Sequence, residues 1–374
     1  MLVLSSACTF QSVVAALVGG GLIGALAGTR LLGQHKTLPS ATFVPSVTFG
    51  VIGGGYLLQQ LVLCTGNTVA AAAAHPGITL FEPPGSSLSY GRILLAAACV
   101  GAGAKLGQGC TCGNGIQGLS GFSRTSFQFV CIFMVTAMVV ASLFETAHTL
   151  DVVDDINDND NSHQIDFQHT TPSAHLLIQI GIATVGIIAQ LDRTSVVPTV
   201  VIDVLAGIAF ATALSVSGMI KPSKVVDFLD VFGTRGWDPS LLGVMGGGIA
   251  VCMSLYQFAG RIRTPAAVPA AAAAAPPPPL AMLHPWITRP MDLEHLLGAL
   301  LFGTGWGLAG LCPGPVLVNC GLQSYKAIVF ALVMFVIRPI IGALQVAMGR
   351  TKTRTSTATR PAGPTTTTTS HKKD

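Results

Sequence analysis

The sequence is poor in charged residues, and this scarcity excludes most soluble classes of protein. Of its 374 residues only 20 are Lys or Arg and 16 are Asp or Glu, together 10% of the chain. Soluble domains carry about a quarter, and so few charges cannot cover a surface in water, which excludes a cytosolic enzyme. The formal net charge of +4 is also too small and scattered for a surface that binds nucleic acid.

Aromatic residues are scarce as well, at 6% of the chain, whereas glycine occurs 43 times and apolar residues make up 50%. Small residues let helices approach closely in lipid, where apolar side chains supply no extra drive for helices to associate. This composition therefore predicts an all-α polytopic membrane protein with the lipid bilayer as its surroundings.

The motifs of metalloproteins and nucleotide-driven pumps are missing too. The nine cysteines lie mostly in apolar runs, without the spacing of a zinc site or a disulfide framework. The glycines of 305–310 match a dinucleotide fingerprint but follow no strand, and no Walker A pattern occurs. The acidic stretch 155–166 lacks the Gly and Glu of a calcium loop. We therefore expect no metal and no cofactor.

Nine stretches are long and apolar enough to cross a bilayer, which takes about 20 residues. They are residues 1–29, 43–64, 92–109, 126–146, 175–190, 200–220, 241–259, 293–311 and 326–349. The first has no basic n-region, so we interpret it as a retained span rather than a cleaved signal. Two Gly-rich stretches, 110–120 and 312–323, are too short to cross and each follows a span, which predicts two re-entrant segments.

The basic residues favour one orientation, because Lys and Arg prefer cytoplasmic loops. Those that this orientation places inside are Arg30, Lys36, Arg124, Arg261, Arg263 and the basic residues of the tail. We predict a plasma-membrane protein with its N-terminus outside and its C-terminus in the cytoplasm, although Lys221 and Lys224 then lie outside, against the rule. The predicted parts are a first half (1–149), an acidic loop with a linking span (150–199), a second half (200–350) with an Ala/Pro linker at 264–290, and a disordered tail (351–374).

An internal repeat relates the two halves. The sequence Gly-Val-Ile-Gly-Gly-Gly at 50–55 recurs as Gly-Val-Met-Gly-Gly-Gly at 243–248, and glycines lie nine and seven residues before both Cys110 and Cys312. The single linking span would invert the second copy, as in many transporters whose binding site lies at the repeat interface. The alternative is that these glycines serve only helix packing.

Each predicted re-entrant segment brings one cysteine to the repeat interface. Pro313 and Pro315 suit the first turn of a helix, which would place Cys312 at a helix N-terminus, where anions bind. A buried thiol resists ionisation, and a neutral S–H can donate to a sulfur-bearing anion without charge repulsion. The alternative is that Cys110 and Cys312 are small packing residues, as we expect for the other cysteines outside the first motif.

Several neighbours complete the candidate site. Lys105 lies inside a predicted span, where an ionisable residue is a functional candidate; it either attracts an anion or extends to the membrane surface. Arg338 raises the same question in the last span. The further support residues are Gly109, Thr111, Cys112, Gly113, Asn114, Pro313 and Gly314.

Residues 107–126 resemble the signature of the YeeE/YedE family of sulfur-compound transporters, Gly-x-Gly-Cys-Thr-Ser-Gly-His-Gly-Ile-x-Gly followed by Ser-Arg and Ser. Residues 217–230, 237–241 and 303–315 resemble the companion module of that family, so the chain looks like a fusion of the two modules. The sequence departs from the pattern in three places: Cys112 replaces Ser, Asn114 replaces His, and no cysteine follows the first span, where Thr29 and Arg30 stand.

The resemblance implies a transporter, not an enzyme, that takes up thiosulfate or a related small sulfur-containing anion. By motif, Cys110 and Cys312 are the cysteines that hand the anion along, and a soluble sulfur-accepting protein is a further candidate partner. Two other functions stay open: a membrane sulfurtransferase that carries a persulfide on Cys110 or Cys112, and a structural membrane subunit.

Overall fold

A computed structural model describes residues 10–32, 45–64, 88–110, 112–144, 172–189, 199–231, 237–262 and 291–348. Every regular element within these ranges is a helix. The elements are α1 (Phe10–Leu32), α3 (Pro45–Cys64), α5 (Tyr90–Leu106), the π-helix η1 (Cys112–Gly118), α6 (Arg124–Leu143), α8 (Pro172–Ala189), α9 (Thr199–Val216), α10 (Pro222–Leu229), α11 (Ser240–Ile262), α13 (Leu293–Ala309), α14 (Pro313–Gly321) and α15 (Tyr325–Ala347).

The long helices lie where the sequence predicts membrane spans, and the chain is an all-α polytopic membrane protein. Among the described helices α6, α9, α11 and α15 are each long and apolar enough to cross a bilayer, and α13 with α14 forms a further pair bent by 41°. Large apolar side chains are exposed on these helices, including Val135 and Val139 of α6 and Leu332 and Val336 of α15. The count of nine crossings stays a prediction.

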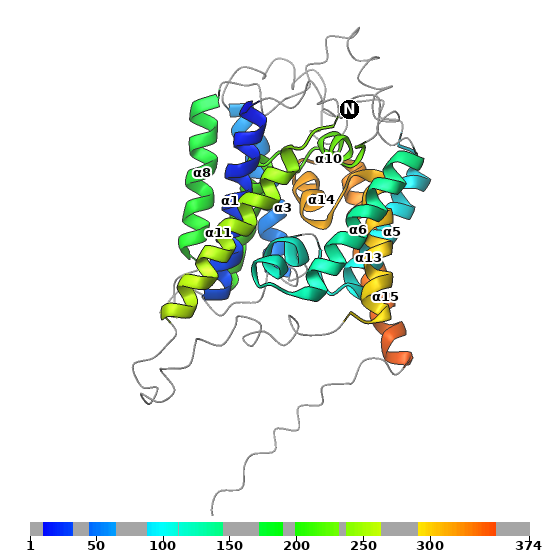
Figure 1. The fold of residues 1–374 in the computed structure, drawn as a ribbon. Coiled ribbons are helices and arrows are strands. Elements are labelled where there is room, and N and C mark those ends of the chain that lie inside the picture. The colour runs from blue at the N-terminus through cyan, green and yellow to red at the C-terminus, as the bar shows by residue number, and fades with distance from the viewer. Residues whose placement is uncertain are drawn as a thin grey trace, which may run out of the picture.

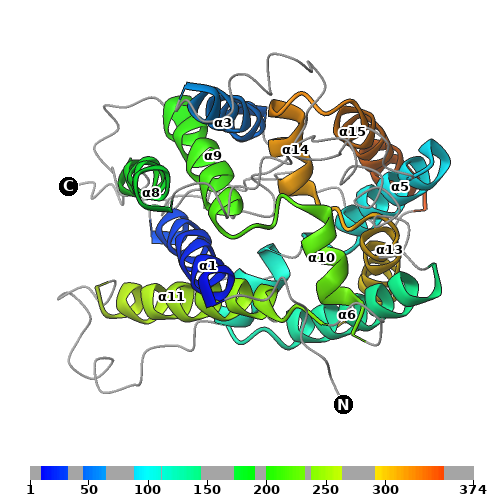
Figure 2. The same cartoon turned by 90° about the horizontal axis from the view of Figure 1, so that it is seen from above.

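The helices form two groups (Figure 1 and Figure 2). Helices α1, α3, α8, α9 and α11 lie on one side, α5, α6, α13 and α15 lie on the other, and α14 lies between them. In Figure 1 α14 is in the upper half of the bundle, whereas the teal segment that leads into α6 is in the lower half. The two short helices therefore occupy different levels between the long ones.

The packing partners of the helices come in matching pairs. Helix α1 packs on α11 as α9 packs on α3, and α6 packs on α13 as α15 packs on α5. The π-helix η1 contacts α1, α6 and α11, as α14 contacts α9, α15 and α3. Helix α8 contacts α9 and α1, the two helices that correspond to each other. Apart from α8 and α10, the described helices thus divide into two sets of five with equivalent neighbours. In chain order the first set is α1, α3, α5, η1 and α6, and the second is α9, α11, α13, α14 and α15.

Glycine makes the closest helix crossings possible. A methyl group placed on Gly20 or Gly24 of α1 would overlap the backbone of Val244 or Gly248 of α11. In the matching crossing, a methyl group on Gly207 of α9 would overlap the backbone of α3. The helix backbones approach so closely at these crossings that they leave no room for a β-carbon. Such close contact is how small residues stabilise helix pairs in lipid.

The structure adds one helix that the sequence analysis did not predict. Helix α10 begins with Pro222, which suits the first turn of a helix. The ring of Phe228 stacks on Trp237, with ring centroids 6.4 Å apart, and Trp237 Nε1 donates a hydrogen bond to the Phe228 carbonyl at 3.0 Å. These contacts hold the end of α10 against Trp237, just before α11 begins.

Candidate functional site

Cys110 and Cys312 are both buried, with 3% and 2% of their surfaces exposed. Each lies in the gap between a long helix and a short one: Cys110 follows α5 and precedes η1, and Cys312 follows α13 and precedes α14. Since α5 and α13 pack directly against each other, the two gaps are attached to one central helix pair.

Cys312 caps the N-terminus of α14, as the sequence predicts. Its backbone is extended, with φ −125° and ψ 165°, and Pro313 begins the helix. Helix α13 ends just before it at Gly310, which adopts the left-handed conformation at φ 65° and donates its N–H to the Trp306 carbonyl. Gly314 packs close to α9, because a methyl group there would lie 3.0 Å from the Phe210 ring.

Cys110 lies in a tighter turn. Gln108 has φ 53°, the N–H of Gly109 donates to the Ala104 carbonyl at 3.1 Å, and the N–H of Asn114 donates to the Cys110 carbonyl at 2.9 Å. The Cys110 sulfur is hydrogen-bonded to the Cys112 side chain and to the backbone N–H groups of Cys112 and Gly113. Thr111, also predicted to support the site, lies outside the described residues.

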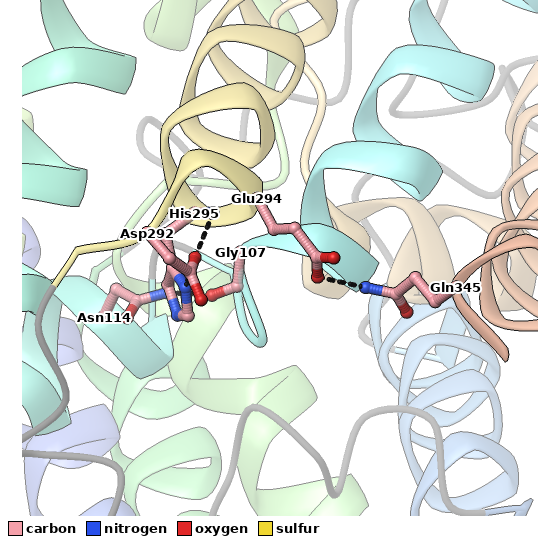
Figure 3. A network of polar contacts seen from close by, with 6 residues as sticks. All are labelled: Gly107, Asn114, Asp292, Glu294, His295 and Gln345. Atoms are coloured by element: carbon pink, nitrogen blue, oxygen red, sulfur yellow. Dashed lines mark hydrogen bonds and ion pairs between the residues drawn. The ribbon is translucent and has the colours of Figure 1, made fainter. Parts of the chain in front are cut away.

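Asn114 connects the two ends of this turn (Figure 3). Its Nδ2 donates to the Gly107 carbonyl at 3.3 Å, as Figure 3 shows. Its Oδ1 accepts from Ser126 Oγ at 3.3 Å. Figure 3 also shows His295, the third residue of α13, whose Nδ1 lies 2.8 Å from Asp292 Oδ1. The amide at position 114 therefore holds η1 to the end of α5 and the start of α6.

Two buried amides, which the sequence analysis missed, anchor the short helices. Gln117 Nε2 donates to the Ala27 carbonyl of α1 at 3.2 Å, and Asn319 Nδ2 donates to the Ile220 carbonyl after α9 at 3.0 Å. The side-chain oxygens of both amides are buried without a hydrogen-bond partner within the described part of the chain. The signal that could have found them is their spacing, since each follows its motif cysteine by seven residues.

Two cations lie on the Cys110 side of the bundle. Lys105, in the last turn of α5, is half-buried, and a methyl group on Gly342 of α15 would lie 3.3 Å from its Cε. Arg338 of α15 lies within electrostatic range of Cys110. The structure thus brings Lys105, Cys110, Cys112, Gly113 and Asn114 into one region. Cys312, Pro313 and Gly314 lie at the corresponding break between α13 and α14.

The arrangement offers hydrogen-bond donors and positive charge, a combination suited to an anion. At Cys110 the donors are the thiols, held in place by backbone N–H groups. At Cys312 they are the thiol and the N–H of Gly314, since Pro313 and Pro315 have no N–H. Within the described ranges no group of three or more His, Cys, Asp or Glu side chains is arranged to hold a metal ion.

Comparison with known proteins places the chain among transporters. Residues 198–354 match the family of unknown function DUF6691. A probable transporter of Xylella fastidiosa strain Temecula1 is 32% identical over 129 residues, which cover 34% of this chain and 78% of that protein. A probable transporter from a second strain of the species is also 32% identical, with 80% of its length covered. No solved structure matches the chain. At this identity and coverage, the chain belongs to the family of these probable transporters.

Proposed function

We propose that this protein takes up thiosulfate or a related small sulfur-containing anion across the plasma membrane, and that Cys110 and Cys312 pass the anion along the route. The observation that carries the proposal is that both thiols are buried at the break between a long and a short helix, at equivalent places in the packing pattern. The family membership supports membrane transport rather than an enzymatic reaction.

The two halves form an inverted repeat in this proposal. The paired packing partners support it, as do two left-handed residues at equivalent places, Phe122 before α6 and Gln323 before α15. Ser123 and Ser324 follow them and cap the next helices in the same way, each accepting from an N–H three residues later. In inverted-repeat transporters the substrate site lies where the broken helices meet near the middle of the membrane.

The chemistry of the two breaks suits a weakly held anion. The thiols are soft, weak donors. The first turn of α14 adds the N–H of Gly314 and the positive end of the helix dipole, because Pro313 and Pro315 carry no N–H. At Cys110 the N–H groups of Cys112 and Gly113 donate to the sulfur itself and hold the thiol in place. Transport requires that each contact be weak enough to release the anion to the next one, which many strong contacts would prevent.

Uptake of labelled thiosulfate tests the proposal in cells that lack other routes for it. We expect Cys110→Ala and Cys312→Ala each to lower the initial uptake rate about tenfold or more, because each variant removes one contact of the route. Cys131→Ala is the matched control, since Cys131 is exposed on the outer face of α6, and it should transport normally. Normal uptake by both site variants would refute the relay.

Two further measurements separate the alternatives. A sulfur atom that stays attached to Cys110 or Cys112 after exposure to thiosulfate, detected by mass spectrometry, would indicate a sulfurtransferase instead. Uptake that is unchanged when the whole protein is removed would indicate a structural subunit. In the proposed function the anion is delivered unmodified, and a soluble sulfur-accepting protein would meet it in the cytoplasm.

A further inference from the structure

The face of α15 that packs on α5 carries a line of polar contacts within an otherwise apolar helix. A methyl group on Gly101 of α5 would lie 2.9 Å from the Met334 carbonyl, and Gly342 lies against Lys105. Arg338 is four residues from both Met334 and Gly342, so all three share this face of α15. Helical spacing alone therefore directs Arg338 toward α5, and its electrostatic interaction with Cys110 agrees with that direction.

The same face continues to the end of the helix. Gln345, buried and three residues beyond Gly342, donates to Glu294 Oε2 in the first turn of α13 at 2.7 Å (Figure 3). Arg338 and Lys105 thus lie between the buried Cys110 thiol and a polar end of the bundle that also carries a carboxylate. Charged side chains inside a membrane protein are costly and mark ligand routes.

The other half has no such charges at the equivalent places. The crossing of Gly101 with Met334 corresponds to that of Gly303 with Phe133, where a methyl group on Gly303 would lie 3.1 Å from the Phe133 Cα. Ala137, four residues beyond Phe133, corresponds to Arg338, and Gly307 corresponds to Lys105. A methyl group placed on Gly307 would lie 2.5 Å from the Ala137 carbonyl oxygen. At these paired positions, positive charge is therefore present only on the Cys110 side, although the buried Lys224 of α10 lies elsewhere beside the end of α13.

We propose that Arg338 and Lys105 form an anion-binding site between α5 and α15, directly beside Cys110. This site deepens the proposed function and rests on it for the identity of the anion. A guanidinium binds oxygen atoms of an oxyanion through a planar set of donors, whereas a thiol is a better partner for sulfur. Together they suit an anion that has both sulfonate-type oxygens and a terminal sulfur, as thiosulfate does.

The charge at these paired positions makes the two breaks unequal. An anion meets the cations and Cys110 together, and it meets Cys312 without a cation on the matching face. The site therefore concentrates the anion near Cys110.

Uptake kinetics in proteoliposomes that contain the full chain test the site. Arg338→Gln should raise the KM for thiosulfate about tenfold or more, Lys105→Gln should raise it less, and Arg338→Lys should restore part of the loss. Lys326→Gln is the matched control: Lys326 lies at the other end of α15, where its Nζ donates to the Leu88 carbonyl, and its KM should stay within about twofold. An unchanged KM in Arg338→Gln would overturn the inference.

A second measurement does not depend on transport. Two small methanethiosulfonate reagents, one anionic and one cationic, are applied to the purified protein, and modification of Cys110 is followed by mass spectrometry. In the wild type the anionic reagent should react faster with Cys110, and Arg338→Gln should lower the ratio of the two rates about tenfold. Equal rates in the wild type, or a Cys110 that neither reagent reaches, would overturn the inference, because an anion route must admit a small anion.

The two measurements separate this inference from the proposed function. If thiosulfate is not transported but Cys110 prefers the anionic reagent, the anion site stands and the substrate is a different anion. If uptake depends on both cysteines but the rates at Cys110 are equal, the relay stands and the cationic site is wrong.

Discussion

Asp292 shows how one side chain at the surface sets the start of a buried helix. It caps α13, and its carboxylate accepts from both the backbone N–H and the imidazole of His295. Burial raises the pKa of Asp292, but these hydrogen bonds outweigh that effect, so its pKa lies below the ordinary value. A carboxyl group whose pKa is lower in the folded state stabilises the fold only while it is ionised.

The lowered pKa of Asp292 determines how the stability of the fold should depend on pH. The contribution of Asp292 is fully present above the unfolded pKa of about 3.9 and is lost as the pH falls through the lower folded value. Asp292→Ala should lower the free energy of unfolding by about 1 kcal/mol at neutral pH, whereas Asp292→Asn keeps a cap and loses only the charge. Thermal unfolding in detergent between pH 3 and 7 measures this; an equal loss for Ala and Asn at every pH would contradict it.

Among the elements, the two Gly-Gly-Gly runs give a test with internal controls. A methyl group on Gly55 of α3 would overlap the carbonyl of Val318 in α14, and one on Gly248 of α11 would lie 2.9 Å from the Ile116 side chain in η1. At Gly53 and Gly246, the first glycine of each run, nothing lies within 4 Å of the added methyl. The third glycine of each run thus faces a short helix, α14 for Gly55 and η1 for Gly248.

We therefore predict opposite outcomes within each run. Gly55→Ala and Gly248→Ala should displace the short helices and reduce thiosulfate uptake several-fold. Gly53→Ala and Gly246→Ala should transport normally and unfold at an equal or higher temperature, because Ala is more stable than Gly inside a helix by about 0.5–1 kcal/mol. Uptake assays with matched expression levels check this; a loss at the first glycines as large as at the third would contradict it.

These elements also show what could be read from the sequence. The apolar runs predicted the long helices because a span needs length and little charge, and Pro313 predicted the N-terminus of α14 because proline tolerates the first turn. Helix α10 escaped prediction because its eight residues depend on packing against Trp237 rather than on apolar length. The approach of Arg338 to Cys110 could not be predicted either, since it depends on how α15 packs on α5.

At the scale of the whole molecule, contacts at one end of α5 fix the directions of two equivalent helices. Arg92, near the start of α5, lies over the ring of Phe144, which follows the last residue of α6. Lys326, in the first turn of α15, lies over the ring of Tyr90, the first residue of α5. Helix α6 therefore ends where α15 begins, so these equivalent helices run in opposite directions, as an inverted repeat requires.

This geometry predicts on which side of the membrane two equivalent turns lie. Phe122 and Gln323 are both exposed and left-handed, and they precede α6 and α15 respectively. Because the two helices run in opposite directions, the turns lie at opposite ends of the bundle.

In cells that produce Phe122→Cys or Gln323→Cys with Cys131 replaced, a membrane-impermeant maleimide should label one variant from outside and the other only after permeabilisation. With the C-terminus in the cytoplasm, α15 begins outside, so Gln323→Cys should be the variant labelled in intact cells. Labelling of both from the same side would refute the inverted arrangement, and labelling of Phe122→Cys alone would keep the repeat but reverse the predicted orientation.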